Sequence, residues 1–267
     1  MADRLRCISP IDGKVVVERA LASAAEIARA VERARAAQRG WRETAIAERA
    51  ALVGRFVDAM VADKQRLGEE LTRQMGRPVR YTPGEIAGGM AERARRMAAL
   101  APESLADLAT EPKAGFTRFI RREPLGLVFV IAPWNYPYLT AVNAIVPALL
   151  AGNAVLLKHS HQTPLVAEAF AEGLRKAGLP DGLFQVLHLS HADTETLIAS
   201  DAVDFVAFTG SVAGGHAVVR AAQGRFIGSL VQKTLKVIGP GWVDSELSLG
   251  SRSILRSRKN QGTDVSS

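Results

Sequence analysis

Three apolar segments of the sequence lead into polar residues that could carry chemistry. Asn135 follows the first segment, Lys158 ends the second, and Ser211 follows the third. A lysine at the end of a buried strand suits a nucleotide's ribose or phosphate, and a hydroxyl beside the free N–H groups of a helix N-terminus suits a phosphate. Pro137 can open a helix directly after Asn135. The amide would then lie at a strand-to-helix turn, where α/β enzymes carry their chemistry.

Each of these motifs also has a plainer interpretation. Trp134 could simply pack while Asn135 caps the following helix, and Lys158 could be a solvated surface lysine. The segment Gly210–Gly215 could be an ordinary tight strand-to-helix loop. On the residues alone, both interpretations stay open.

An alternation of strands and helices would bring these turns to one edge of a sheet. The apolar runs are rich in Val, Ile and Phe and have the length of strands buried on both faces. The predicted strands span residues 125–131, 154–158, 184–189 and 203–208, and the helices span 138–150, 164–177, 193–200 and 212–222. These repeats predict an α/β fold with a Rossmann-like, doubly wound parallel sheet, whose strands all end at the same edge.

The residues before this sheet are predicted to form a helical region without chemistry of its own. Ser23 and Glu26 form a capping box that starts a helix, and Gly40 is expected to end it. The sequence predicts an extended segment or a hairpin within residues 1–20, helices over 24–40, from 44, over 63–76 and over 84–100, and a strand over 116–120. Gly88 and Gly89 weaken the fourth helix.

Composition narrows the possible functions. The chain has 267 residues, 48% hydrophobic and 23% charged, with a net charge of +7. Residues 225–267 hold seven Lys/Arg against three Asp/Glu, a net charge of +4, so the rest of the chain has a net charge of only +3. For that main part, the charged residues favour a solvated surface over nucleic-acid binding. Cys7 is the only cysteine, which excludes an intramolecular disulfide and a Cys-rich metal site and favours the cytoplasm. No secretory signal or membrane span is expected.

Four motifs occur together in the order and spacing of the aldehyde dehydrogenase superfamily. They are Pro133-Trp134-Asn135-Tyr136-Pro137, Leu157-Lys158-His159-Ser160, Thr163-Pro164 and Phe208-Thr209-Gly210-Ser211, with Gly178-Leu179-Pro180-Asp181-Gly182 as a matching connection. The chain resembles this family from the N-terminal helices to about Gly228. The resemblance implies oxidation of an aldehyde to a carboxylic acid with NAD or NADP. A cysteine attacks the aldehyde, hydride passes to the nicotinamide, and a glutamate activates the hydrolytic water.

The resemblance also implies a role for each matching residue. Asn135 would donate a hydrogen bond in the oxyanion hole. Lys158 would bind the adenosine ribose, and His161 stands where the family has a glutamate that accepts hydrogen bonds from the ribose hydroxyls. The nicotinamide end would be lined by Ile131, Ala132, Pro133 and Trp134, and the pyrophosphate would be contacted by Gly210, Ser211 and Gly215.

Several positions depart from the family pattern. His159 and His161 replace the usual proline and glutamate. A histidine at 161 could bond the ribose or tolerate a 2′-phosphate, so the choice between NAD and NADP stays open. For both histidines, however, simple surface placement is the favoured interpretation. His188–Ala192 replaces a glycine-rich turn, which weakens that phosphate contact, and Val212 stands where threonine is frequent.

The sequence leaves the family pattern after about Gly228. Residues 229–233 stand where the family continues into a Glu-Leu-Gly-Gly motif with the general base, and Glu246–Gly250 lies too far along to replace it. Residues 1–228 are predicted to be the dinucleotide-binding domain, with 113–124 as an oligomerisation arm and 229–267 as a disordered tail. The fold would be incomplete relative to the family and lack its catalytic domain, as after a reading-frame change or truncation.

Three functions are compatible with these observations. The first is a dehydrogenase part that is inactive alone, because Cys7 precedes the first helix and cannot serve as nucleophile; its aldehyde substrate would require a catalytic domain supplied elsewhere. The second is a non-enzymatic module that binds nucleotide or associates, through the arm, with copies of itself or with full-length relatives. Nucleic-acid binding through the basic tail ranks last, and neither a membrane nor a metal partner is expected.

Overall fold

A five-stranded parallel sheet forms the centre of the computed structural model, which describes residues 4–225 and 227–233. In spatial order its strands are β7 (Phe184–Val186), β6 (Ala154–His159), β5 (Leu127–Ala132), β8 (Phe205–Gly210) and β9 (Gly228–Lys233). Every neighbouring pair runs parallel. All residues of β5 and β6 are buried, which explains their uninterrupted apolar sequences. The predicted parallel α/β sheet is confirmed.

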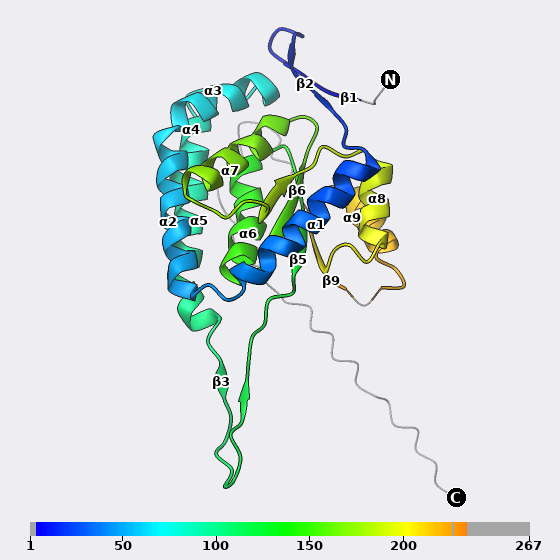
Figure 1. Cartoon of the computed structure of the whole chain (residues 1–267). Coiled ribbons are helices and arrows are strands. Elements are labelled where there is room, and N and C mark those ends of the chain that lie inside the picture. The colour runs from blue at the N-terminus through cyan, green and yellow to red at the C-terminus, as the bar shows by residue number, and fades with distance from the viewer. Residues whose placement is uncertain (1–3, 226, 234–267) are drawn as a thin grey trace, which may run out of the picture. The chain divides into compact units, whose positions relative to one another are not determined.

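Helices cover both faces of this sheet. Helices α6 (Pro137–Leu150) and α7 (Pro164–Lys176) pack on β5, β6 and β7. Helices α1 (Ala24–Trp41), α8 (His191–Ala199) and α9 (Val212–Ala221) cover the other side (Figure 1). Strands β6 and β7 are added on one side of β5, and strands β8 and β9 are then added on its other side. Because strand–helix–strand connections are right-handed, this change of side puts α6 and α7 on one face of the sheet and α8 and α9 on the other.

A second helical layer lies outside α6 and α7. Helices α2 (Ile46–Ala62) and α3 (Lys64–Met75) pack against α7, and α5 (Ala91–Ser104) packs against α6. The predicted capping box of α1 is present, with Ser23 and Glu26 each bonding the other's backbone N–H. Gly40 was expected to end α1 but lies inside it, since the helix continues to Trp41. The indole N–H of Trp41 donates to the Leu149 carbonyl at 2.8 Å, and this bond holds the last turn of α1 on α6.

The helix predicted over residues 84–100 is divided into three pieces. They are the single turn α4 (Thr82–Gly84), the π-helix η1 (Glu85–Met90) and α5. Gly88 and Gly89 lie in the π-helix, where their weak helix preference tolerates the wider turn. A Cβ atom on Gly89 would lie 2.5 Å from Cδ1 of Leu139, so the glycine lets η1 approach α6 closely.

Two antiparallel hairpins complete the described chain. Strands β1 (Arg4–Ile8) and β2 (Val15–Ala20) form the predicted N-terminal hairpin. Strands β3 (Leu108–Ala109) and β4 (Phe119–Ile120) form a second one that extends away from the sheet in Figure 1. The strand predicted over 116–120 is therefore limited to its last two residues. The side chains of Phe116, Phe119 and Ile120 are exposed.

Strand β9 differs from the sequence interpretation. Residues 229–233 were expected to begin a tail without secondary structure, but they belong to a strand that pairs with β8 from Phe205↔Gly228 to Gly210↔Lys233. All six residues of β9 are exposed, so the strand lacks the apolar pattern that marks a buried strand, and its pairing depends on the free edge of β8. The rest of the predicted tail, including Glu246–Gly250, lies outside the described residues.

Candidate functional site

The order of the strands creates a topological switch point at the carboxyl edge of the sheet, which is here named the crevice because doubly wound sheets bind their ligands there. From β5 the chain passes through α6 to β6 and then to β7 on one side. It then crosses through α8 to β8, which lies on the other side of β5. Ligands of doubly wound sheets bind where the strand order reverses in this way. In this chain that position lies between the carboxyl ends of β5 and β8.

The strand register brings most predicted site residues to this edge. Ile131 pairs with Lys158 on one side and with Phe208 on the other. Ala132 ends β5, one residue after Ile131, and Gly210 ends β8, two residues after Phe208. The turn of residues 133–136, here named the β5–α6 turn, follows the end of β5 at this edge. His161 lies beyond the end of β6, and Ser211 and Gly215 belong to the start of α9.

The β5–α6 turn exposes the side chain of Trp134, for which packing was one of the two interpretations left open by the sequence. Pro133 is buried, but Trp134 is 40% exposed, so the packing interpretation of the indole is wrong. Asn135 is half-buried, and its Oδ1 accepts a hydrogen bond from its neighbour's backbone N–H at 3.1 Å rather than from within α6. The helix is instead capped by Glu85, whose Oε1 accepts from the N–H groups of Tyr138 and Leu139.

Lys158 is a largely buried lysine at the same edge. The residue is only 7% exposed, and within the described residues it forms no hydrogen bond or ion pair. Burial lowers the pKa of its ammonium group below the ordinary value. Because an isolated buried charge is costly, a group at the ligand edge that supplies acceptors to Lys158 would be favoured. A solvated surface position is excluded by this burial.

The two departing histidines occupy different environments. His159 is 2% exposed, and its Nδ1 lies 3.2 Å from Oγ1 of Thr163. Its Nε2 has no hydrogen-bond partner within the described residues. The nearby Pro137 carbonyl favours the charged ring and so acts to raise its pKa, but burial acts more strongly in the opposite direction. Burial lowers the pKa of His159 to about 3, so the ring is neutral near pH 7. Surface placement is therefore wrong for His159.

His161 lies among other basic groups. It is half-buried, and its Nε2 lies 2.9 Å from the Leu189 carbonyl. The His191 ring lies 6.3 Å away. Burial lowers the pKa of His161, and the charges of Lys158, His191 and His188 lower it further, while the Leu189 carbonyl opposes them. The segment that replaces a glycine-rich turn thus contributes a carbonyl and two rings to this region.

The N-terminus of α9 is the one of the four βα turns best suited to an anion. Glu85 bonds the first N–H groups of α6, Gln74 bonds Leu165 in α7 at 3.0 Å, and α8 has Asp193 in its first turn. The first turn of α9 contains no acidic residue, and Ser211 satisfies only the N–H of Gly214, at 3.1 Å. The remaining N–H groups and the helix dipole therefore favour a negative charge there.

The glycines of the β8–α9 turn have a packing role that the sequence did not indicate. A Cβ atom on Gly210 would lie 2.5 Å from Cζ of Phe208, and one on Gly214 would lie 2.7 Å from the same atom. A Cβ atom on Gly215 would lie 2.9 Å from Val231 in β9. The turn can therefore rest on the Phe208 ring only if these residues are glycines, which also leaves its backbone open to a ligand.

Two charged residues of the N-terminal helical region reach the β5–α6 turn, although the sequence interpretation treated that region as scaffold. Glu85 is 7% exposed, and its carboxylate forms an ion pair with Arg77. Arg77 also donates a hydrogen bond to the carbonyl of Asn135, and its guanidinium carbon lies 4.3 Å from the centre of the Tyr136 ring. No sequence motif pointed to these contacts, which join residues more than fifty positions apart.

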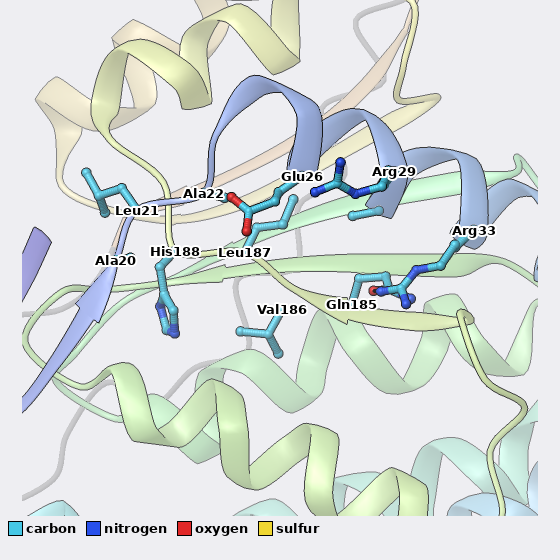
Figure 2. A pocket seen from close by; sticks show the side chains of 11 residues that line it. Ala20, Leu21, Ala22, Glu26, Arg29, Arg33, Gln185, Val186, Leu187 and His188 are labelled. Carbon is cyan, nitrogen blue, oxygen red and sulfur yellow. Dashed lines mark hydrogen bonds between the residues drawn. The ribbon is translucent and has the colours of Figure 1, made fainter. Parts of the chain in front are cut away.

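A separate cavity of about 380 Å³ lies beside the edge strand β7 and contains none of the predicted site residues. Figure 2 shows it between α1 and the segment that follows β7, with Arg29 and Arg33 projecting from the helix and His188 from the opposite segment. Arg33 already donates a hydrogen bond to Gln185 at 2.6 Å, and Glu26 is engaged in the α1 capping box. His188 also acts electrostatically on His161, so the cavity borders the histidines at the end of β6 but contains none of the predicted site residues.

Cys7 does not lie in the crevice. The residue is buried in β1, where its Sγ lies 3.2 Å from the carbonyl of Gln162. Burial raises the pKa of its thiol, which disfavours the reactive thiolate. Among residues 4–225 and 227–233, no three His, Cys, Asp or Glu side chains are grouped so that they could hold a metal ion. None of the helices in these ranges has the length and apolar character needed to cross a membrane.

Comparison with known proteins gives a consistent match. The sequence profile of the aldehyde dehydrogenase family matches residues 1–234. The chain is 36% identical over 231 residues to 3,6-anhydro-alpha-L-galactose dehydrogenase of Streptomyces coelicolor, covering 84% of this chain and 45% of the relative. It is 34% identical over 215 residues to the NADP+ succinate-semialdehyde dehydrogenase of Deinococcus radiodurans, covering 80% of this chain and 45% of that protein.

Solved structures show the same relationship. The structure of PnpE in complex with nicotinamide adenine dinucleotide has a TM-score of 0.80 and 28% identity, over 86% of this chain and 47% of that chain. Succinic semialdehyde dehydrogenase from Streptococcus pyogenes in complex with NADP+ has a TM-score of 0.79 and 25% identity, over 85% and 50%. The chain thus spans about half the length of the relatives it matches.

Proposed function

The chain belongs to the aldehyde dehydrogenase family, and on that premise we propose that it binds NAD or NADP in the crevice between β5 and β8. The observation that carries the proposal is Lys158, a lysine that is 7% exposed, has no side-chain partner in the described structure and lies in register with Ile131 beside the switch point. A nucleotide ribose or phosphate supplies the oxygen acceptors that this group lacks. Relatives with bound NAD or NADP+ support the same class of ligand.

The residues on this edge would divide the dinucleotide among them. Lys158 and His161 would bind the adenosine ribose, and the N-terminus of α9, with Gly210, Ser211 and Gly215, would bind the pyrophosphate. Ile131, Ala132, Pro133 and Trp134 would line the nicotinamide end. When bound, the cofactor supplies a hydride acceptor, and the amide of Asn135 would stabilise negative charge on a carbonyl oxygen held beside it.

The binding experiment uses the full 267-residue chain. Thermal unfolding would be followed with NAD, NADP, and ATP as a nucleotide without nicotinamide. A ligand that binds only the folded state adds about 2.7 kcal/mol to the free energy of unfolding when its concentration is 100 times its Kd, and Tm rises as a result. We expect NAD or NADP to raise Tm in a concentration-dependent manner. Unchanged Tm with both dinucleotides, at concentrations up to several millimolar, would contradict the proposal.

We propose further that this chain does not oxidise aldehydes by itself. The family reaction requires a cysteine nucleophile, and Cys7 is buried in β1, outside the crevice. In the relatives, the second half of the protein would supply the cysteine, the general base and the aldehyde pocket. The test is NADH or NADPH formation with a panel of short aldehydes and semialdehydes. Activity that persists in a Cys7→Ala variant would overturn this proposal.

A second candidate function is subunit association through the hairpin of β3 and β4, here named the arm (residues 113–124, as predicted, together with β3). The arm presents Phe116, Phe119 and Ile120, exposed by 64%, 49% and 57%. Exposed apolar side chains of this kind mark interaction surfaces, so the arm would join copies of this chain or pair it with a full-length relative in the cytoplasm. Light scattering after size exclusion distinguishes an oligomer from a monomer.

A further inference from the structure

The backbone of the β5–α6 turn is held by two charged residues from a different part of the chain. Glu85 lies under the N-terminus of α6, where its Oε1 accepts hydrogen bonds from the N–H groups of Tyr138 at 2.9 Å and Leu139 at 3.1 Å. Its other oxygen pairs with Arg77. One carboxylate therefore caps the helix and anchors the cation that reaches the turn.

Arg77 extends this contact to the predicted oxyanion donor itself. One guanidinium nitrogen pairs with Glu85, and another donates to the carbonyl oxygen of Asn135. The guanidinium also stacks over the ring of Tyr136, with its carbon 4.3 Å from the ring centre. The side chain of Arg77 is 15% exposed and that of Glu85 is 2% exposed. Solvent therefore competes little for these bonds, which hold the peptide that follows Asn135.

The local sequence explains how the two charges reach this position. Gly76 ends α3 in the left-handed region, with φ of 77°, and the chain turns there so that Arg77 follows directly. Glu85 is the first residue of the π-helix η1, and Gly89 in the same element allows close packing on Leu139. Single turns of π-helix are often found at functional sites because they reposition a side chain.

The cost of this arrangement argues that it has more than a packing role. Removing a carboxylate and a guanidinium from water is expensive, and an apolar pair of similar volume is often equally stable. Burial alone raises the pKa of Glu85, against the opposing effects of Arg77 and of the Leu139 and Tyr138 N–H groups. An apolar pair could fill the same volume, but it could not donate to the Asn135 carbonyl or cap α6.

We propose that Arg77 and Glu85 are positioning residues that fix Trp134 and Asn135 for the nicotinamide end of the cofactor. The inference rests on the proposed dinucleotide function, because the nicotinamide end is defined by it. The segment after α3 and the π-helix η1, which both precede the sheet in sequence, thus contribute to the site through the backbone of the turn. A variant that loosens the turn should weaken contacts at the nicotinamide half and spare those at the adenosine half.

The test compares two ligands and one optical signal in the full chain. Isothermal titration would give Kd for the dinucleotide that stabilises the protein and for the matching adenosine half, 5′-ADP for NAD or 2′,5′-ADP for NADP. For Glu85→Gln we expect Kd of the dinucleotide to rise about tenfold and Kd of the adenosine half to change less than twofold. Glu92→Gln, an exposed neighbour on α5, should leave both unchanged, and Arg77→Lys, which keeps the charge, should show a smaller loss than Arg77→Gln.

The optical signal tests positioning even if no dinucleotide binds. In a Trp242→Phe background, acrylamide quenching reports mainly on Trp134, because Trp41 is only 5% exposed. Glu85→Gln should increase the quenching constant about twofold, while Glu92→Gln should not. An equal loss of affinity for the dinucleotide and its adenosine half, or unchanged quenching in both Glu85→Gln and Arg77→Gln, would overturn the inference. Absence of all binding with increased quenching would contradict the proposed function alone.

Discussion

Lys158 illustrates how one residue can be unfavourable for folding and favourable for binding. The residue is only 7% exposed, and its ammonium group has no partner within the described residues. Such a group destabilises the folded chain until a ligand supplies acceptors. Replacing the lysine should therefore separate folding from binding in a way that few active-site substitutions allow.

The corresponding prediction concerns Lys158→Met. A hydrogen bond to a charged group contributes about 1.5–3 kcal/mol, so the variant should bind NAD or NADP roughly 10- to 100-fold more weakly. Tm without ligand should stay the same or rise, since an uncompensated buried charge is removed. Titration calorimetry and thermal unfolding measure the two effects. Lys14→Met, on a fully solvated side chain, is the control, and equal affinity of both variants would contradict the role of Lys158.

His161 allows a prediction about cofactor choice. Lys158, His188 and His191 all act on this ring as positive or potentially positive neighbours. In His161→Glu a carboxylate would face the ribose, and Coulomb repulsion of about 1–4 kcal/mol would act on a 2′-phosphate. The ratio of NADP affinity to NAD affinity should fall at least about fivefold, as measured by titration. His161→Gln adds no charge and should shift the ratio much less; an unchanged ratio in both variants would show that 161 does not face the ribose.

His159 predicts how stability depends on pH. Its pKa is about 3 in the folded chain and about 6.5 when unfolded, so the unfolded state binds one more proton between these values. The free energy of unfolding should therefore fall as pH decreases from about 6.5, by up to about 1.4 kcal/mol per unit from this residue. Urea unfolding at pH 7, 6 and 5 measures it. His159→Gln should flatten the curve, whereas the exposed His216→Gln should not.

Among the elements, the arm offers the clearest prediction. Phe119 and Ile120 in β4 are exposed, yet they belong to a two-residue strand with little internal support. A hairpin this short is marginal by itself, so a partner surface would stabilise it. Phe119→Glu should shift an oligomer to monomer in light scattering at micromolar concentration. Ile11→Glu, an equally exposed position in the N-terminal hairpin, is the control. A monomeric parent chain would contradict the arm's role.

The elements also show how far sequence reasoning reached. Strands β5 and β6 and helices α6 and α7 were predictable because buried strands and amphipathic helices leave clear apolar patterns. Strand β9 was missed because all six of its residues are exposed and its pairing is imposed by β8. The division of residues 82–104 into α4, η1 and α5 was missed because glycines signal a weak helix without specifying a π-turn.

At the scale of the whole molecule, the site consists of segments that only the fold brings together. The strand ends near Asn135, Lys158 and Ser211 could be predicted to meet, since parallel strands deliver their carboxyl ends to one edge. The contribution of Arg77 and Glu85 could not be predicted, because it depends on contacts between distant helices that carry no local pattern. The roles of the individual site residues remain predictions for the binding experiments.

Cys7 makes this chain well suited to those experiments. The only thiol of the sequence is buried in β1, next to the Gln162 carbonyl, and has a raised pKa. Maleimide dyes and spin labels react with exposed thiolates, so the natural chain should stay unmodified under native conditions. A single cysteine introduced at an exposed position, such as Val212 at the start of α9, would then be labelled alone. The β8–α9 turn could be observed by fluorescence or paramagnetic resonance without a cysteine-free background.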